Sequence, residues 1–318
     1  MVTFRWLAVL LLLCGGCTVH HRGSISYADS VSVQNSVELE NTAFFPQDKY
    51  QCGPAALATA LQSSGISIRP SELISKIYLP GRRGSLQTEI ISTSRSYGRV
   101  AYIIKPDINA LIRELQAGYP VLVLQNIGLR YLPVWHYAVV IGYSHESGEI
   151  ILRSGTTRRK SLPVKKFIKT WAAANHWGLI LLKPDQLPAE NNPAQFLKAV
   201  ADLEETGQAD ASLTGYETAV NRWPENQIAW FGIGNAHYHK QLYDRAENAF
   251  RQTLALNPDH LPAINNLALT LTKLGYVNAA QTLINKTLVR INTQSPMYQT
   301  LLQTQQEIIG KQPLGISD

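Results

Sequence analysis

A single cysteine stands where a polar loop meets an apolar helical run. Cys52 is followed by Gly53 and Pro54, and then by a stretch rich in alanine and leucine. Proline suits the first helical turn, and alanine and leucine favour helix. Cys52 is therefore expected at or just before a helix N-terminus, where the helix dipole and unpaired N–H groups stabilise a thiolate. Gly53 is expected to leave open space beside the sulfur. These features suit a nucleophile, although small residues around a cysteine also occur in ordinary tight packing.

A nucleophilic thiol needs a base, and the best candidate is His136. It follows Trp135 and begins the apolar run 137–143, which is typical of a buried strand. A histidine there can lie at a cleft edge, take the thiol proton and later protonate a leaving amine. The alternative is a histidine that only forms part of the sheet. The other histidines are expected in tether, turn or repeat positions.

The strand of His136 is expected to pair with residues 149–155 as a hairpin. A turn centred on Glu146 and Ser147 would place His136 opposite residues 154–156. Glu146 and Glu149 would then lie too far from His136 to orient its ring.

Residues 42–184 are predicted to form an α+β domain, with helices first and an antiparallel sheet later. Asp107 and Ser85 are expected to be helix N-caps. The remaining helix is expected to begin near Arg69, and the strands are expected at 100–104, 121–124, 136–143, 149–155 and 177–182.

The N-terminus is predicted to be a targeting segment. Arg5 precedes the apolar run 7–13, which is too short to span a bilayer, and Gly15-Gly16-Cys17 follows. This arrangement resembles a bacterial lipobox, with Cys14 where leucine is commoner. Residues 1–16 are expected to be a signal peptide, and residues 17–41 a tether lipidated on Cys17. The alternative is an ordinary signal peptide that happens to contain cysteines.

A lipidated protein would be anchored to a membrane in the cell envelope. Thr18 follows Cys17, so the aspartate that retains lipoproteins at the inner membrane is absent. The periplasmic face of the outer membrane is therefore the favoured location. Since Cys14 would leave with the signal and Cys17 would carry lipid, only Cys52 would remain as a thiol. A lone exported thiol is exposed to oxidation, which favours a functional role.

The charge pattern does not indicate a nucleic-acid partner. The formal net charge is +6, and the basic residues are dispersed apart from 158–160 and 165–166. These two short clusters are interpreted as a solvated loop or a contact with an acidic surface. The sequence has no glycine-rich phosphate loop and no metal-ligand spacing, so neither a cofactor nor a metal is expected.

Gln47 with the Cys52-Gly-Pro-Ala-Ala-Leu segment, together with residues 135–143, resembles the papain-like cysteine peptidases that cleave bacteriocin leaders after a double glycine. The resemblance covers residues 42–184 and is closest to stand-alone forms in bacterial lipoproteins. It implies that Cys52 is the nucleophile, that His136 is the base, and that Gln47 donates to the oxyanion. Gln51 is the alternative donor. The implied substrate is a peptide or protein.

One position departs from that family. The family usually has an aspartate after the histidine strand, whereas this sequence has Ser154 there. A neutral group can still hold an imidazole tautomer, but it stabilises imidazolium less. Ser154 is therefore the predicted orienter of His136, with Asn126 and Asn175 as alternatives. A weak or inactive peptide-binding adaptor, or an acyl transferase using the same pair, also fits.

The C-terminal part is predicted to be an all-α tetratricopeptide-repeat array. Pro224 and Pro258 lie 34 residues apart, and Gly234, Ala246 and Phe250 occupy the spacing of such a repeat. Residues 185–192 are expected to be a linker, 193–307 to be repeats closed by a helix after Pro296, and 308–318 to be a tail. Such arrays bind a peptide or protein partner in a concave groove.

Overall fold

The computed structural model describes residues 32–47 and 50–310. Within them an antiparallel sheet of seven strands carries the N-terminal domain, in the order β2-β7-β3-β4-β5-β6, with β1 paired to the end of β4. The strands are β1 (Val37–Glu38), β2 (Val100–Ile103), β3 (Val121–Asn126), β4 (Trp135–Ser144), β5 (Glu149–Ser154), β6 (Thr157–Pro163) and β7 (Gly178–Leu182). The predicted α+β class is confirmed.

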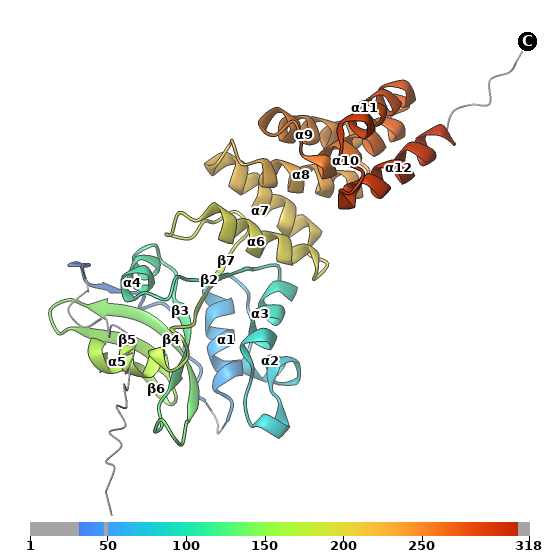
Figure 1. Ribbon diagram of the computed structural model, residues 1–318. Helices are drawn as coiled ribbons and strands as arrows, with labels where there is room; N and C mark the ends of the chain where they lie inside the picture. The colour runs from blue at the N-terminus through green and yellow to red at the C-terminus, as the bar shows by residue number, and fades with distance from the viewer. Residues whose placement is uncertain (1–31, 48–49, 311–318) are drawn as a thin grey trace, which may run out of the picture.

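Helices cover both faces of this sheet (Figure 1). Alternate residues of a strand point to opposite faces of the sheet, and the side chains of β4 do so. Tyr137, Val139 and Ile141 join the core beneath the first helices, whereas Ala138 and Val140 join the core on the other face. The first face carries α1 (Cys52–Ser63), α2 (Pro70–Ile77), η2 (Pro80–Arg82) and α3 (Gln87–Ser96). The other face carries α4 (Ile108–Gln116) and α5 (Val164–Ala172).

Two local predictions are confirmed. Asp107 caps α4, since its side chain accepts from the N–H of Ala110 at 3.1 Å. The β4–β5 hairpin has the expected register at Val139, which lies opposite Arg153, whereas a bulge between Val140 and Gly142 shifts the pairing nearer the turn by one residue. The expected cap at Ser85 is wrong, because α3 begins at Gln87 with no side-chain cap.

Residues 32–41 are not a free tether. Val37 and Glu38 pair with the end of β4, and Leu39 donates to the carbonyl of Ile141 at 2.8 Å. The apolar side chains of Val33, Val37 and Leu39 pack against the core. Burial of these side chains explains why this part of the predicted tether joins the domain.

The two basic clusters do not lie in a loop. Arg158, Arg159 and Lys160 belong to β6, and Lys165 and Lys166 belong to α5. β6 is an edge strand with an exposed first half, so its sequence lacks the apolar alternation that predicts a strand. Arg159 forms a two-pronged ion pair with Glu38, with both distances at 2.8 Å.

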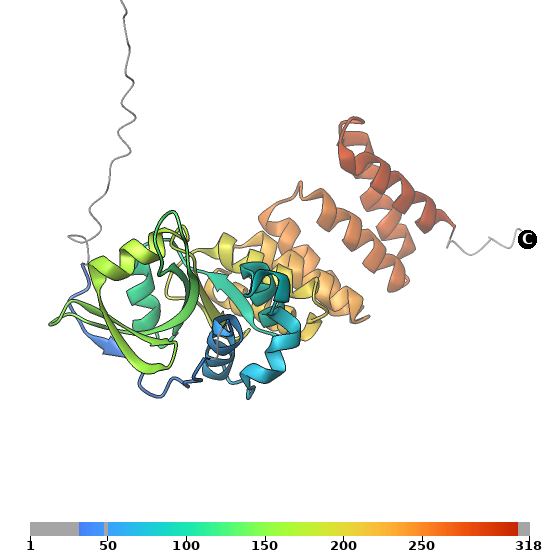
Figure 2. The same ribbon diagram turned by 90° about the horizontal axis from the view of Figure 1, so that it is seen from below.

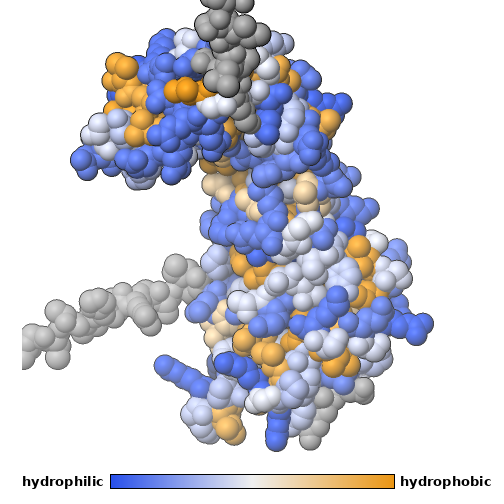
Figure 3. All heavy atoms as spheres, turned by 90° about the vertical axis from the view of Figure 1, so that its right-hand side faces the viewer, coloured by the Kyte–Doolittle hydropathy of each residue, from blue (hydrophilic) through white to orange (hydrophobic). Residues whose placement is uncertain are grey.

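The C-terminal part is a stack of antiparallel helices, as predicted (Figure 2). Helices α6, α8 and α10 begin 34 residues apart, each pairs with the helix after it, and α12 follows as the predicted last helix. The helices are α6 (Pro193–Glu204), α7 (Ala209–Arg222), α8 (Gln227–His239), α9 (Tyr243–Leu256), α10 (Leu261–Lys273), α11 (Val277–Arg290) and α12 (Pro296–Ile309). The side of the molecule in Figure 3 shows hydrophobic groups that are separated by hydrophilic residues.

The predicted linker is fixed to its neighbours. Glu114 of α4 accepts from the N–H groups of Ala189 and Glu190 at 3.0 and 3.2 Å, and Asn191 accepts from the indole of Trp223 at 2.8 Å. These bonds satisfy the buried carboxylate of Glu114 and two backbone N–H groups of the linker at the same time. The connection is therefore part of the packed structure.

Helix α3 joins the two halves of the molecule. Its first residue, Gln87, lines a cleft, whereas Arg95 forms an ion pair with Asp202 of α6, and Gln208 donates to the carbonyl of Ser96 at 3.1 Å. A helix of ten residues is about 15 Å long. The repeats therefore attach at the end of the domain opposite the cleft.

A shared core also connects the two halves. Phe196 of α6 is fully buried in a cluster that continues from the sheet into α8. Phe196→Ala is expected to lower the free energy of unfolding by about 3–5 kcal/mol and to shift one common transition in chemical denaturation. Val289→Ala is the control, because Val289 is 88% exposed. Two separate transitions, with only the one for the repeats displaced, would contradict the shared core.

Candidate active site

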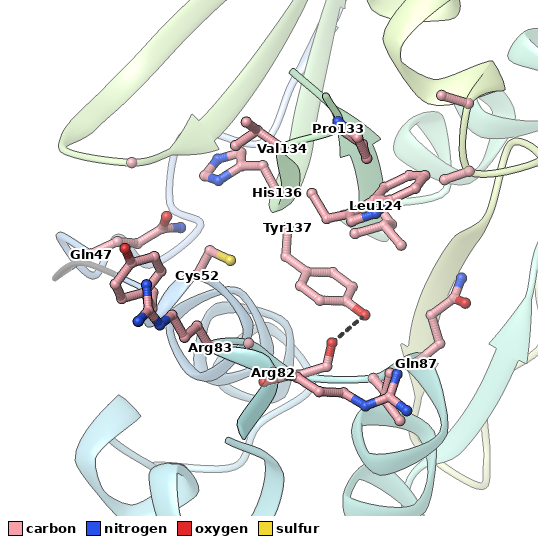
Figure 4. A pocket seen from close by; sticks show the side chains of 18 of the residues that line it. Gln47, Cys52, Arg82, Arg83, Gln87, Leu124, Pro133, Val134, His136 and Tyr137 are labelled. Atoms are coloured by element: carbon pink, nitrogen blue, oxygen red, sulfur yellow. Dashed lines mark hydrogen bonds between the residues drawn. The ribbon is translucent and has the colours of Figure 1, made fainter. Parts of the chain in front are cut away.

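A cleft of about 980 Å³ lies at the end of the sheet where α1 begins. One wall is the segment from η2 to the start of α3, and the other is formed by Pro133, Val134 and Trp135, just before and at the start of β4. Cys52, His136 and Gln47 lie between these walls (Figure 4). The fold thus brings Gln47 and Cys52, which are close in the sequence, to one cavity with His136, which lies 84 residues after Cys52.

Cys52 is the first residue of α1, as predicted, and its thiol is free. Its sulfur accepts from the backbone N–H groups of Tyr137, Gly53 and Cys52 itself, which lower the pKa of the thiol. Burial acts in the opposite direction and is the larger effect, so the pKa of Cys52 is raised above the ordinary cysteine value. The expectation of a stabilised thiolate is therefore wrong for the resting site, since removal of water outweighs the helix dipole.

Gly53 serves a different purpose from the one expected. A side-chain carbon at this position would meet the hydroxyl oxygen of Ser85 at 2.3 Å. Glycine is thus required for the start of α3 to approach the start of α1. Ser85 fills the space that the sequence suggested would be open.

His136 forms a hydrogen bond with the predicted orienter. Its Nε2 lies 2.9 Å from Oγ of Ser154, the buried last residue of β5. Because Ser154 engages Nε2, Nδ1 is the nitrogen left to accept a proton from a thiol. Burial first, and then the charge of Lys160, lower the pKa of His136 to about 4.

Gln47 lines the same cleft as Cys52 and His136. Its backbone N–H donates to the carbonyl of Gly155 at 3.2 Å, so the turn after Ser154 also holds the segment that carries Gln47. Gln51 caps α1 by position and is not among the cleft residues, so the cleft favours Gln47 as the amide donor.

The two alternative orienters differ in position. Asn126 accepts from the N–H groups of Gly128 and Val134 at 3.0 and 2.9 Å, which ties its side chain to the loop between β3 and β4. Asn175 lines the cleft, at the turn between α5 and β7. Cys17, the predicted lipid acceptor, lies outside the described residues.

Arg153 is a buried residue of the site region that the sequence did not reveal. Its guanidinium donates to the carbonyl oxygens of Thr42, Arg158 and Glu40 at 3.1, 2.6 and 2.8 Å. It therefore fixes the segment leading to Gln47 against the strand that carries Ser154. The role of Arg153 could not be predicted from its partners, because every residue type has a backbone carbonyl. The only signal in the sequence is the position of an arginine between a buried apolar run and Ser154.

Both reacting groups are neutral at neutral pH. The pKa of Cys52 lies above its ordinary value, and that of His136 lies at about 4. The cleft thus holds a neutral thiol and a neutral imidazole, which are the protonation states that general-base activation requires. Among residues 32–47 and 50–310, no three His, Cys, Asp or Glu side chains are grouped so that they could hold a metal ion.

The pKa values predict how the thiol reacts with an alkylating reagent. Only the thiolate is alkylated rapidly, so the reaction of Cys52 with iodoacetamide should be slow at pH 7 and should rise about tenfold for each pH unit up to its raised pKa. Mass spectrometry of the peptide that contains Cys52 measures this rate. A pH-independent rate between pH 5 and 8 would contradict it and would indicate a preformed ion pair.

The fold and the cleft together define an α+β domain with the fold of the C39 peptidases. Residues 32–178 match the Peptidase_C39 like family, and residues 197–260 match the tetratricopeptide repeat. The chain therefore consists of a Peptidase_C39-like domain followed by tetratricopeptide repeats, as the sequence predicted.

Two solved structures resemble the first domain. A C39-like peptidase from Bacillus anthracis is 20% identical, covers 47% of this chain and 98% of its own, and has a TM-score of 0.40. The peptidase domain of Streptococcus ComA, a bifunctional ABC transporter of a quorum-sensing pathway, is 22% identical, covers 45% and 98%, and has a TM-score of 0.37.

Part of the chain resembles a longer curated protein. The peroxisomal targeting signal receptor of Yarrowia lipolytica is 31% identical over 96 residues, which are 29% of this chain. The chain spans only 16% of that receptor's length.

Proposed function

We propose that this protein is a membrane-anchored cysteine peptidase that hydrolyses peptide bonds through Cys52 and His136. The observation that carries the proposal is the grouping of Cys52, His136 and Gln47 in one cleft, with His136 bonded to Ser154 at 2.9 Å. The C39-like fold of residues 32–178 supports the same reaction class.

In the proposed reaction, Nδ1 of His136 takes the thiol proton as the sulfur of Cys52 attacks the carbonyl carbon. The carbonyl oxygen becomes an oxyanion, which the backbone N–H of Cys52 and the side-chain amide of Gln47 stabilise, each donor contributing about 3 kcal/mol. The tetrahedral intermediate breaks the C–N bond, and His136 returns the proton to the leaving amine. A water molecule, deprotonated by His136, then hydrolyses the thioester and restores the thiol.

Ser154 has a positioning role in this scheme. If Nε2–H of His136 donates to Oγ of Ser154, the tautomer with a free Nδ1 is selected. A neutral hydroxyl stabilises the imidazolium that forms during attack less than a carboxylate would. The proposed enzyme is consequently slower than one with an aspartate at this position.

Anchoring is the second part of the proposal. Lipid on Cys17 would hold the protein at the periplasmic face of the outer membrane, as the lipobox-like segment and Thr18 suggest. In the part of the chain that the structure covers, no helix is both long and apolar enough to cross a bilayer. The repeats would bind a protein partner or the substrate itself, which is the usual use of such arrays.

A non-catalytic adaptor is the second candidate. The neutral partner of His136 and the raised pKa of Cys52 favour it, because both reduce the reactivity of the thiol. In that case the cleft would bind a peptide without cutting it, and the repeats would scaffold an envelope complex.

Covalent trapping distinguishes these candidates. The purified chain is incubated with a peptidyl acyloxymethyl ketone, and separately with a pool of unstructured peptides. A peptidase gives the probe mass on Cys52 and new peptide termini, whereas an adaptor gives neither. Adding an amine of ordinary nucleophilicity, such as glycinamide, separates hydrolysis from acyl transfer, because a transferase passes the acyl group from the thioester to the amine in preference to water.

A further inference from the structure

The loop between β3 and β4 is a protruding hairpin with an unusually apolar surface. We call residues 127–135 the apolar hairpin. Its large apolar side chains are half exposed or more: Ile127 at 50%, Leu129 at 55%, Tyr131 at 84%, Leu132 at 66%, Val134 at 51% and Trp135 at 50%. Exposed apolar residues that are scattered singly need no explanation, whereas a contiguous group marks an interaction surface. In Figure 1 this hairpin lies at the end of β3 and β4 away from the repeats.

Most backbone N–H groups of the apolar hairpin are hydrogen-bonded. Ile127 donates to the carbonyl of Val134 at 2.9 Å, and Leu129 and Leu132 exchange two bonds at 3.1 Å. The side chain of Asn126 accepts from Gly128 and Val134. The remaining non-tip position, Pro133, has no N–H. The N–H groups of residues 127, 128, 129, 132 and 134 therefore all have partners within the hairpin or on Asn126.

The hydrogen bonds of the hairpin help to distinguish a peptide that would add a strand from a partner that would contact the side chains. A peptide that adds a strand needs a row of free N–H and C=O groups at the edge it joins. The hairpin offers few free donors, so its apolar side chains are what a partner would contact. Paired backbone groups are also what an apolar medium requires, since an unpaired N–H in lipid is costly.

The charges around the hairpin favour an anionic surface. Arg130 is the one charged residue within 127–135, and Tyr131 and Trp135 are the residue types that accumulate at membrane interfaces. Arg82 and Arg83 stand on the opposite wall of the cleft, and neither forms an ion pair with a described residue. No Asp or Glu is found among the described residues that line the cleft.

The length of chain before the described residues would keep the domain close to the membrane that carries the lipid. A lipid on Cys17 would be connected to Ser32 by 15 residues, which can span at most about 50 Å. This step rests on the lipidation included in the proposed function. A domain held that close to a bilayer meets it repeatedly.

We propose that the apolar hairpin inserts its side chains into the interfacial region of an anionic lipid bilayer. Leu129, Tyr131 and Leu132 at its tip enter first, while Arg130 binds lipid phosphates. The mouth of the cleft then faces the membrane surface, because Val134 and Trp135 belong to both the hairpin and the cleft wall. The substrate is accordingly a polypeptide segment presented close to the bilayer.

Vesicle binding tests this proposal without relying on catalysis. The chain beginning at residue 17, with Cys17→Ser so that no lipid is attached, is mixed with vesicles of phosphatidylglycerol and phosphatidylethanolamine and sedimented. The triple variant Leu129→Ser, Tyr131→Ser, Leu132→Ser should bind about tenfold more weakly or worse, since apolar burial drives such binding. The control replaces Tyr276 and Val289 with serine, which are 57% and 88% exposed on the repeats, and should bind as the parent does.

Three results would overturn the proposal. The first is that the parent chain binds no vesicles, the second is that the triple variant binds as well as the parent, and the third is that the parent self-associates through the hairpin in the absence of lipid. Loss of peptide cleavage in solution by the triple variant, with vesicle binding intact, would assign the hairpin to substrate binding instead. Unchanged near-ultraviolet circular dichroism establishes that each variant is folded. Cleavage by Cys52 can succeed or fail independently of vesicle binding, so the two proposals are tested separately.

Discussion

Cys52→Ala and His136→Gln are each expected to lower kcat/KM for peptide hydrolysis by on the order of 10⁴-fold or more. The first change removes the atom that forms the thioester, and the second removes the group that accepts the thiol proton. Because the two side chains act as one unit, the double variant should lose hardly more activity than either single variant. Steady-state kinetics on any peptide shown to be cleaved measures all three.

His145→Gln is the matched control for this prediction. His145 follows β4 directly and is exposed in the β4–β5 turn, whereas His136 lies at the other end of the same strand. The ten residues of β4 span about 30 Å. This variant should retain full activity. If His136→Gln and His145→Gln behaved alike, His136 would not be the base.

Ser154→Asp is expected to produce the next largest effect, which is a gain. A carboxylate beside Nε2 favours the charged imidazolium, so the pKa of His136 should rise from about 4 toward neutrality. The same charge would stabilise the imidazolium formed during attack, and kcat/KM at pH 7 should rise by about tenfold or more. The pH profile gives a second signature: its acid limb, which reports protonation of the base, should move to higher pH.

Two further variants define the cause of that gain. Ser154→Ala removes the hydrogen bond and should lower kcat/KM by roughly fivefold, as expected for about 1 kcal/mol. Ser147→Asp adds the same charge in the exposed β4–β5 turn and should change neither the rate nor the acid limb. An unmoved acid limb in Ser154→Asp, with normal activity in Ser154→Ala, would remove Ser154 as orienter and leave Asn175 on the cleft wall as the alternative.

The features that sequence could predict are those that depend on neighbouring residues. The start of α1 at Cys52 follows from Gly53 and Pro54, and the cap of α4 follows from Asp107. The 34-residue period of the repeats required only that equivalent residues recur. The proximity of His136 and Ser154 could be inferred as well, since the turn between β4 and β5 sets the hairpin register.

The features that sequence missed depend on distant parts of the chain. β6 is an edge strand rich in charge, so its residues show no apolar alternation. Arg153 binds carbonyl oxygens of segments more than a hundred residues earlier, and any residue type could supply those carbonyls. The raised pKa of Cys52 reflects burial beneath β4, which outweighs the helix N-terminus that the local sequence displays.

The rigid attachment of the repeats through α3 has a consequence for substrate choice. The first residue of α3 lies at the cleft, and its last residues contact α6 and Gln208, the residue just before α7. A protein held by the repeats could therefore reach Cys52 only through a flexible spacer long enough to pass along the domain. Such a substrate would be presented at an effective concentration set by spacer length, up to the millimolar range for a well-matched spacer. Selection would then depend on the distance between docking site and scissile bond, so a weak nucleophile could act on one polypeptide while leaving abundant untethered ones intact.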